Sequence, residues 1–208
     1  MITIYTYNGQ VLSESATGKW FTEKVVDPYN PLDLPPNTIR VRTSDGQPPI
    51  KGVVTSYETA TLVPGTTDTY DVYKSGTNFS YIFEDSTNIV EVIAANTTNI
   101  IGMMEAFFGC TSLTTVSLFD TTSVSIAYRM FTGCTSLTSV PLFDLSNVTN
   151  MNSMFAGCYN VQTGALALYQ QVSTQATPPA NHTGAFRNCG RDTTTGAAEL
   201  AQIPSDWK

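Results

Sequence analysis

A short pattern recurs along this chain at a constant spacing. Phenylalanine occurs at positions 107, 131 and 155, and in each copy a cysteine follows three positions later, which sets a period of 24. Such a period is typical of proteins in which each copy buries its apolar side only by stacking on the next copy. We therefore predict a stack of coils whose core contains a ladder of equivalent side chains. The predicted ladder consists of Phe83, Phe107, Phe131, Phe155, Phe186, Cys110, Cys134, Cys158 and Cys189.

The repeat also predicts where the stack begins and ends. Residues 83–92 align with the first full copy but lack its Gly and Cys, which is typical of a capping coil. The interval from Cys158 to Cys189 exceeds the period by seven, and residues 165–172 in this insertion are expected to form a short helix. Two prolines at 178–179 prevent that helix from continuing. The expected closing cap contains Leu200, Ile203 and Trp207.

Within a full copy, Leu137, Val140 and Leu142 are expected to point inward around a short strand. Asp144 with Ser146, and Asp120 with Thr122 one copy earlier, occupy equivalent sites, and their carboxylates can be interpreted as a catalytic pair. The favoured interpretation is a turn in which the side chain satisfies free backbone N–H groups. The exposed Thr, Ser and Asn of successive copies would form rows of hydroxyls and amides, which either bind glycans or proteins or simply keep the surface soluble.

Residues 1–80 follow a different pattern. MITIYTY, TIRVRT and TYDVYK alternate apolar and polar residues, KGVVTSYETATLV indicates a further strand, and Pro and Gly clusters separate them. We expect a small β-rich domain of five or six strands over 1–80, followed by the repeat domain over 81–208. The proline-rich run at 27–36 is either a long loop or the join between two hairpins, and Tyr29 and Pro31 in it are candidates for packing or for display.

Composition excludes several classes of function. The formal charge is −7, the pI is near 4.5 and only 13% of residues are charged, so the chain lacks the basic surface that binds nucleic acid or anionic membranes. No run approaches the roughly 20 apolar residues of a membrane span, and we expect no signal peptide in MITIYTYNGQ. We therefore predict neither nucleic-acid binding nor membrane insertion.

The chain also lacks the residues of common catalytic and metal sites. His182 is the only histidine, and a single loop histidine is more often solvated than catalytic. Successive cysteines are separated by at least one full period, whereas zinc sites use close pairs. They are expected to form a ladder of small buried side chains, with disulfides between stacked copies as the alternative. No nucleotide or hydrolase motif occurs. We predict no catalytic residues, no cofactor and no metal, and hence no enzymatic activity.

One unit carries a resemblance to a known family. The pattern M-F-x-G-C-x-S-L-T-S-V-P-L-F-D-x-S-N-V-T-N-M, complete at 130–151 and partial at 106–124 and 152–161, resembles the BspA-like leucine-rich repeats. These occur in bacterial surface proteins and in copies encoded by gut-associated mobile elements and phages. The resemblance covers about residues 83–190 and implies a right-handed solenoid with adhesive or recognition roles. The predicted fold is thus a β-rich N-terminal domain followed by a leucine-rich-repeat-like α/β solenoid of four to five coils.

A β-rich module followed by a repeat module is also similar to phage structural proteins. Surface members of the family usually have a signal peptide, more repeats and an anchor, which we do not expect here. We therefore expect a homo-oligomeric virion protein whose residues 1–80 attach to other virion proteins and whose residues 81–208 recognise a host surface protein or glycan. One alternative is a bacterial cell-surface or secreted adhesin. Another is a fragment of a longer repeat array.

Overall fold

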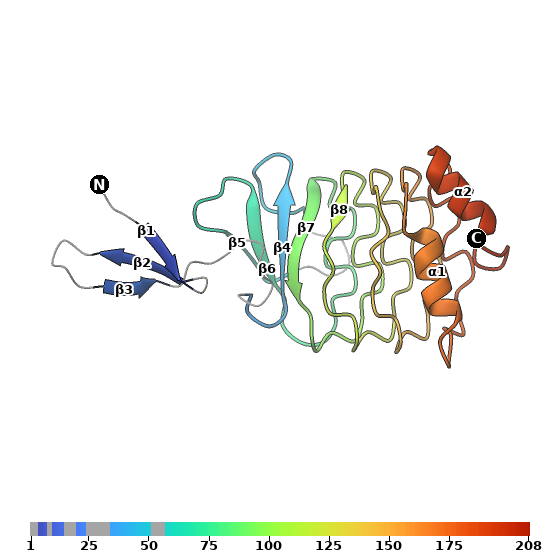
Figure 1. Ribbon diagram of the computed structural model, residues 1–208, viewed down its shortest axis with the longest axis horizontal. Helices are drawn as coiled ribbons and strands as arrows, with labels where there is room; N and C mark the ends of the chain where they lie inside the picture. Colours follow the sequence, from blue (N-terminus) through green and yellow to red (C-terminus); the bar gives the residue numbers. More distant parts are fainter. Residues whose placement is uncertain (1–3, 8–9, 15–19, 24–33, 51–56) are drawn as a thin grey trace.

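The structure, a computed structural model, describes residues 4–7, 10–14 and 20–23 as strands, and residues 34–50 and 57–208 in full (Figure 1). The three strands are β1 (Ile4–Tyr7), β2 (Gln10–Glu14) and β3 (Trp20–Glu23), which form an antiparallel sheet in the order β1-β2-β3. β1 lies within the strand predicted at MITIYTY. Tyr29, Pro31 and residues 51–56 of the strand predicted at 51–63 lie outside the described residues.

A second, mixed sheet has the strand order β5-β6-β4-β7-β8. It consists of β4 (Thr38–Thr43), β5 (Thr59–Leu62), β6 (Thr69–Tyr73), β7 (Ile89–Asn96) and β8 (Thr115–Val116). β4 lies at the centre, antiparallel to β6 and β7, and β8 is parallel to β7. β-Branched residues favour strands, and Ile39, Val41 and Val72 are fully buried. Arg40 is buried beside them because Asp71 binds its guanidinium with two hydrogen bonds of 2.6 and 2.8 Å.

This sheet crosses residue 80, the predicted domain boundary. β4 and β6 precede the boundary and β7 and β8 follow it, yet β4 pairs with β7 along its whole length. One cluster of buried apolar side chains contains Ile39 and Val72 from one side of the boundary and Phe107 and Phe131 from the other. The fully described residues on the two sides of residue 80 therefore share one sheet and one core.

From Asn78 onward the chain forms stacked layers, seen as the successive green to orange loops in Figure 1. Parallel bridges join the first residues of successive layers, which are Asn78, Gly102, Ile126, Asn150 and Asn181. Layer 1 is 78–101, layer 2 is 102–125, layer 3 is 126–149, layer 4 is 150–180 and layer 5 is 181–208. The first four of these residues are equally spaced, by the same interval as the phenylalanines of the repeat, so the sequence period is the length of one layer.

Backbone hydrogen bonds join adjacent layers on two sides. On one side the N–H groups donate to the following layer, as from Phe107 to the carbonyl of Met130 at 2.9 Å. On the other side they donate to the preceding layer, as from Thr138 to the carbonyl of Thr114 at 3.1 Å. The layers thus satisfy one another's buried backbone groups although each contains little regular strand.

The predicted leucine-rich-repeat-like α/β solenoid is wrong. The regular structure described is mostly the single five-stranded mixed sheet, with two short helices, α1 (Ala165–Ser173) and α2 (Thr194–Gln202). Residues 78–163, all of which are described, contain no helix. The reason is the backbone of the layers, in which left-handed residues recur four positions apart, as at Glu105 (φ 53°) and Gly109 (φ 69°). A left-handed residue interrupts an α-helix, and the three residues between two of them are too few to form one.

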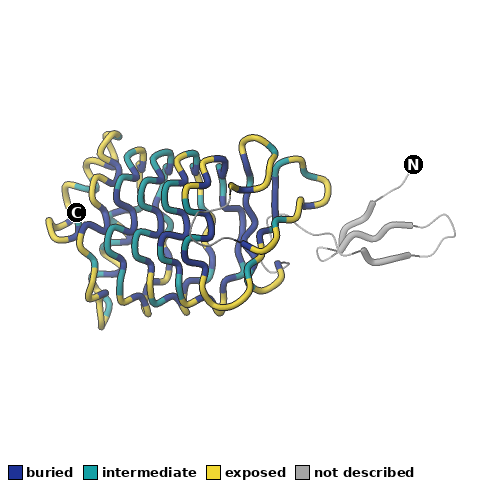
Figure 2. Tube along the Cα trace, turned by 180° about the vertical axis from the view of Figure 1, so that it is seen from behind, coloured by how far each residue is buried: buried dark blue, intermediate teal, exposed yellow. Residues whose placement is uncertain are grey.

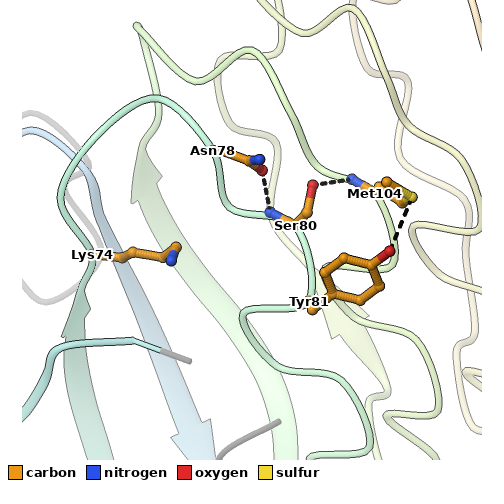
Figure 3. A pocket seen from close by; sticks show the side chains of 5 residues that line it. All are labelled: Lys74, Asn78, Ser80, Tyr81 and Met104. Atoms are coloured by element: carbon orange, nitrogen blue, oxygen red, sulfur yellow. Dashed lines mark hydrogen bonds between the residues drawn. The ribbon is translucent and has the colours of Figure 1, made fainter. Parts of the chain in front are cut away.

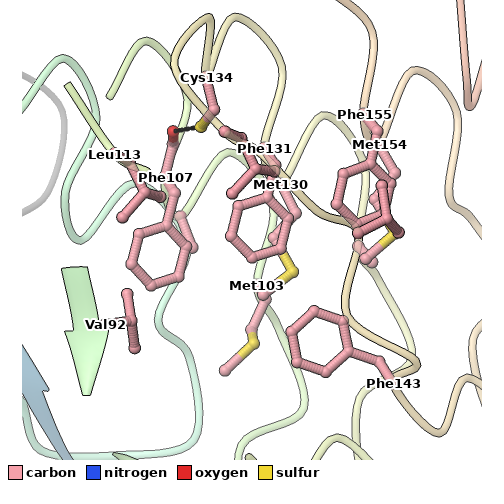
Figure 4. Packing of buried hydrophobic residues seen from close by; sticks show 14 of the residues in the cluster. Val92, Met103, Phe107, Leu113, Met130, Phe131, Cys134, Phe143, Met154 and Phe155 are labelled. Atoms are coloured by element: carbon pink, nitrogen blue, oxygen red, sulfur yellow. Dashed lines mark hydrogen bonds between the residues drawn. The ribbon is translucent and has the colours of Figure 1, made fainter. Parts of the chain in front are cut away.

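Equivalent phenylalanines of successive layers stack in the core (Figure 4). Phe107, Phe131 and Phe155 lie nearly parallel, with ring centroids 5.1 and 5.2 Å apart. Phe83 extends the stack at one end, 5.3 Å from Phe107, and Phe186 at the other, 6.1 Å from Phe155. Figure 2 shows the buried interior continuing through all the layers, with exposed residues at their corners. The structure thus brings all five predicted ladder phenylalanines into one stack.

The cysteines lie in the same core, and all four are free and fully buried. The Sγ–H groups of Cys110, Cys134 and Cys158 donate to the backbone carbonyl of the phenylalanine one layer back, at 3.1 to 3.2 Å. Burial raises the pKa of every thiol, and it raises the pKa of Cys189, with a smaller contribution from Glu199, to about 12. The cysteines therefore serve as small core residues, not as disulfides.

Aromatic residues outside the repeat cover both ends of the stack. Tyr57 lies 6.3 Å from Phe83, and Trp207 lies 6.5 Å from Phe186. Trp207 belongs to the predicted closing cap, together with the buried Ile203 and the partly buried Leu200. α1 and α2 complete this cap, and Figure 1 shows both at the C-terminal end of the layers.

The two helices support each other at their ends. Glu199 of α2 accepts hydrogen bonds from the backbone N–H groups of Gly164 (3.4 Å) and Leu166 (3.1 Å), which begin α1. A carboxylate at a helix N-terminus satisfies free donors and favours the helix dipole. Thr193 caps α2 through its side-chain oxygen, which accepts from Gly196 N at 3.1 Å.

Candidate recognition surface

Each layer turns sharply at one corner, where two residues have a left-handed backbone. The first is Tyr81, Glu105, Arg129, Ser153 or Gly184, with φ from 53° to 64°. The second, four residues later, is Asp85, Gly109, Gly133, Gly157 or Asn188, with φ from 57° to 76°. Glycine adopts this conformation without steric cost, and it occupies the second position in layers 2 to 4. The first position carries a side chain in four of the five layers despite the same backbone.

Three residues per layer lie at this corner outside the shared apolar core. They are the first left-handed residue, the residue before it and the third residue after it. We call the region that they form the turn face. Its members, layer by layer, are Ser80, Tyr81 and Glu84; Met104, Glu105 and Phe108; Tyr128, Arg129 and Thr132; Asn152, Ser153 and Ala156; and Thr183, Gly184 and Arg187. Thr183 and Arg187 in it are exposed, Ser80, Glu105, Ala156 and Gly184 are buried, and the other members are half-buried.

The turn face differs from layer to layer, whereas much of the frame around it repeats. At none of the three positions do two layers carry the same residue type. Layers 2 and 3 show this most clearly, since FFGCTSL at 107–113 and FTGCTSL at 131–137 differ only where the turn face has Phe108 and Thr132. Away from the turn face, the matched pairs of these layers include Thr114 and Thr138, Asp120 and Asp144, and Ser125 and Thr149. The demands of the fold account for the repeated positions but leave the turn face unspecified.

Arg129 lies at the centre of an ordered cluster on the turn face. Its Nη1 donates to Oε1 of Glu105 at 3.0 Å, and its guanidinium carbon lies 4.4 Å from the ring centre of Phe108 and 5.8 Å from that of Tyr128. The side chain of Glu105 is only 10% exposed, whereas that of Arg129 is 34% exposed. A guanidinium over an aromatic face is attracted by the ring quadrupole. The cluster therefore holds a charged group in a fixed place at the surface.

A shallow hollow of about 160 Å³ lies at the layer 1 end of the turn face (Figure 3). It is lined by Lys74, Asn78, Ser80, Tyr81 and Met104. Within it, Ser80 N donates to Asn78 Oδ1 at 2.8 Å, Met104 N donates to Ser80 Oγ at 3.2 Å, and the Tyr81 hydroxyl donates to Met104 Sδ at 3.2 Å. These bonds fix the lining side chains. Their amide, hydroxyl, ammonium and thioether groups suit the binding of a polar group rather than acid–base chemistry.

The threonines and serines at the other corners serve the stacking itself. We call two pairs of them the hydroxyl rows: Thr114 and Thr138, and Ser125 and Thr149. The hydroxyls of Thr114, Thr138 and Thr149 donate to backbone carbonyls of the preceding layer at 2.8 to 3.1 Å. The side-chain amides of Asn147 and Asn160 do the same at 2.7 and 2.9 Å. These five donors, which belong to the rows that the sequence suggested for glycan binding, are therefore already bonded within the chain.

The aspartates considered as a catalytic pair form turns. Asp120 Oδ1 accepts from the backbone N–H of Thr122 at 2.9 Å and from its hydroxyl at 2.6 Å. Asp144 Oδ1 accepts from Ser146 N at 2.9 Å, and hydrogen bonds from the side chain and the backbone of Ser146 lower the pKa of Asp144. These contacts agree with the favoured interpretation, in which the side chains satisfy backbone donors.

His182 belongs to the C-terminal cap. Its ring stacks on Trp207 with centroids 4.0 Å apart, its Nδ1 lies 2.9 Å from the carbonyl oxygen of Pro179, and its Nε2 lies 3.3 Å from Asp206 Oδ2. The side chain is 26% exposed. His182 is thus a packed residue of the cap and not the solvated loop residue that the sequence suggested.

Stacked turns and short strands, with side-chain variation concentrated at one corner, define a repeat protein with a variable surface. The chain belongs to the family described as "Mycoplasma protein of unknown function, DUF285", whose model matches residues 55–169. No curated protein and no solved structure matches the chain. In the described part of the chain, no helix is long and apolar enough to cross a membrane, and no three His, Cys, Asp or Glu residues are grouped to hold a metal ion.

The turn face was not among the features predicted from the sequence. Those predictions rested on positions that repeat, whereas the turn face is marked by positions that differ between copies. This signal is visible without a structure in the pairs Met104 and Tyr128, Glu105 and Arg129, and Phe108 and Thr132, which differ inside two otherwise similar copies. A comparison of the copies for their differences would have found it.

Proposed function

We propose that this chain is a non-enzymatic binding protein that recognises a partner's surface through the turn face. The observation that carries the proposal is that all three turn-face positions vary in every layer while much of the surrounding frame, such as the Phe-x-Gly-Cys-Thr-Ser-Leu of layers 2 and 3, repeats. Loops on a rigid scaffold are the usual place for binding residues because their side chains are free of packing demands. Here the backbone of each turn is fixed by bonds to the next layer, such as Glu105 N to Tyr128 O at 2.9 Å.

The left-handed backbone of the first turn position supports the same conclusion. Tyr81, Glu105, Arg129 and Ser153 adopt a conformation that costs a non-glycine residue about 1 kcal/mol. Glycine would remove this cost, and the chain uses glycine four residues later. Side chains that are kept in a strained conformation, where glycine would remove the strain, suggest a role in binding.

The titratable groups that could serve catalysis are occupied elsewhere, which supports a binding role. Asp120 and Asp144 hold turns, and His182 packs on Trp207 in the cap. The turn face instead carries Tyr, Met and Arg, residue types that are enriched in protein interfaces.

The setting that we propose is a virion, with the N-terminal part of the chain attached to other virion proteins and the turn face displayed toward a host surface. The alternative is a bacterial cell surface. A cut at residue 80 cannot separate these roles, because it would divide β4 from β7 in one sheet. The test therefore uses the full chain.

The test exchanges side chains between matching positions of two layers. In the turn-face variant, Met104→Tyr and Phe108→Thr give layer 2 the residues of layer 3. In the control, Thr115→Ser and Ser125→Thr make the same exchange away from the turn face. Fluorescently labelled full chains are titrated onto whole bacterial host cells and onto purified phage particles, and the Kd is measured.

We expect the turn-face variant to bind host cells at least about tenfold more weakly, which corresponds to about 1.4 kcal/mol, and the control to bind them within about twofold of the unchanged chain. Both should keep the thermal midpoint of the unchanged chain within a few degrees. Weakened binding by the control alone, or binding by the unchanged chain to neither probe, would contradict the proposal. Binding to cells, to particles or to both distinguishes the two settings.

A further inference from the structure

We infer that the partner of the turn face is a protein that presents a carboxylate to Arg129. The inference rests on the function proposed above and adds the chemical class of the partner and the contact that anchors it. It starts from the guanidinium group, which has five N–H donors in a planar fork.

One edge of this guanidinium has no hydrogen bond to any described residue. Nη1 of Arg129 is bonded to Glu105, whereas Nε and Nη2 make up the unbonded edge, and the side chain is 34% exposed. The same edge of another arginine shows what it binds. Nε and Nη2 of Arg40 hold the two carboxylate oxygens of Asp71 at 2.6 and 2.8 Å. The geometry of the unbonded edge on Arg129 matches a carboxylate in the same way.

Arg129 is also ordered before any partner arrives. Glu105 fixes one end of the guanidinium, and the rings of Phe108 and Tyr128 lie beside its plane. A long side chain that is already ordered loses less entropy on binding, and rigid arginine and tyrosine side chains carry much of the energy of protein interfaces. Arg129 therefore has the properties of an interface anchor.

A carbohydrate partner fits the cluster less well. Sugars bind aromatic side chains by stacking their C–H groups on an open ring face. The face of the Phe108 ring is covered by the guanidinium of Arg129 at 4.4 Å, and Tyr81 donates its hydroxyl proton to Met104. The cluster offers two donor groups of Arg129 that are not bonded to a described residue, beside two aromatic rings, which suits an acidic side chain with apolar neighbours.

The experiment combines treatment of the probe with substitution of the arginine. Host cells are pretreated either with protease or with periodate, which cleaves sugar diols, and labelled full chain is then titrated onto them. Arg129→Lys keeps the positive charge but loses the planar fork. The matched control is Arg191→Lys, because Arg191 also lies over a tyrosine ring, that of Tyr159 at 4.1 Å, but is not part of the turn face. Glu105→Gln is a second variant, which keeps the shape of the cluster while weakening the hold on Nη1.

We expect protease to abolish binding and periodate to leave it unchanged. Among the variants, Arg129→Lys should weaken binding at least tenfold and Glu105→Gln about threefold. The control, Arg191→Lys, should change it less than twofold. Binding that survives protease and is lost after periodate would overturn the inference in favour of a glycan while the proposed function stands. Arg129→Lys or Glu105→Gln binding like the unchanged chain would exclude the carboxylate contact. If the variant with Met104→Tyr and Phe108→Thr also binds like the unchanged chain, both the inference and the proposed function are wrong.

Discussion

The turn face and the hydroxyl rows belong to the same layers but differ in whether their side chains repeat from one layer to the next. In the hydroxyl rows the side chains repeat, as Thr114 and Thr138 do, because each donates to a carbonyl of the layer before it. On the turn face the side chains differ in every layer, because the bonds between layers there are made chiefly by the backbone. Repetition marks the positions that build the stack. On the turn face, variation occurs where the backbone bonds between layers do not require a particular side chain.

The same contrast appears within a single turn. Both left-handed positions have the same backbone, but the second is glycine in layers 2 to 4 while the first carries Glu105, Arg129 and Ser153 there. A position chosen only for stability would take glycine in both cases. The first position therefore trades some stability for a side chain, which is a common feature of functional sites.

The largest effect on the shared frame is expected from Phe131→Ala. Phe131 is fully buried between Phe107 and Phe155, so its removal leaves a cavity in the middle of the stack. The free energy of unfolding should fall by about 3 to 5 kcal/mol in urea denaturation. Thr132→Ala, the neighbouring turn-face change, should cost about 1 kcal/mol or less, since it removes a hydroxyl that donates to Ser153 O. Equal losses from the two substitutions would contradict the division between frame and turn face.

Smaller changes in stability, opposite in sign, are expected from adding a side chain at the second left-handed position and from removing one at the first. Gly133→Ala should destabilise the chain by about 1 to 2 kcal/mol, and the cost is conformational because a Cβ there would meet its nearest atoms only at 3.8 Å. Ser153→Gly, which relieves φ 57°, should stabilise it by about 0.5 kcal/mol. Chemical denaturation of both variants measures the two changes. A stabilising Gly133→Ala would show that the strain argument for the turn face is mistaken.

The smallest effect is expected in the hydroxyl rows. Thr138→Val removes the hydroxyl that donates to Thr114 O at 3.0 Å, but Thr138 N still donates to the same oxygen at 3.1 Å. Because the acceptor keeps a partner, the loss should be about 0.5 kcal/mol, with binding unchanged. Reduced binding without reduced stability would place the hydroxyl rows in the recognition surface.

The sequence predicted the stacking residues well because their spacing is a direct result of packing one layer on the next. The Phe stack, the buried cysteines, the helix at 165–173 and the cap containing Trp207 all follow from apolar side chains that need cover. It did not predict the layer backbone. A Phe-x-Gly-Cys pattern is compatible with a helical turn or with paired left-handed residues, and only the second fits a hydrogen bond from Phe107 N to the following layer.

Two other features of the structure were not predicted from the sequence. Leu142, expected to point inward, is 49% exposed, and Phe143 is buried instead, because layer 3 has no strand there to impose alternation. The pairing of β4 with β7 joins segments that lie far apart in the chain, which no local pattern records, and it is this pairing that carries the sheet across residue 80.

The most direct test of the account compares two libraries of the full chain. One randomises four turn-face positions, Met104, Phe108, Tyr128 and Thr132, and the other randomises the four residues of the hydroxyl rows. Each is displayed, sorted first for resistance to protease as a measure of folding, and then sorted for binding to host cells after the folded members have been recovered. We expect the turn-face library to contain the larger folded fraction and most of its folded members to lose binding, whereas the folded members of the hydroxyl-row library should still bind. A turn-face library that folds less often than the other, or whose folded members bind as well as the unchanged chain, would contradict the account.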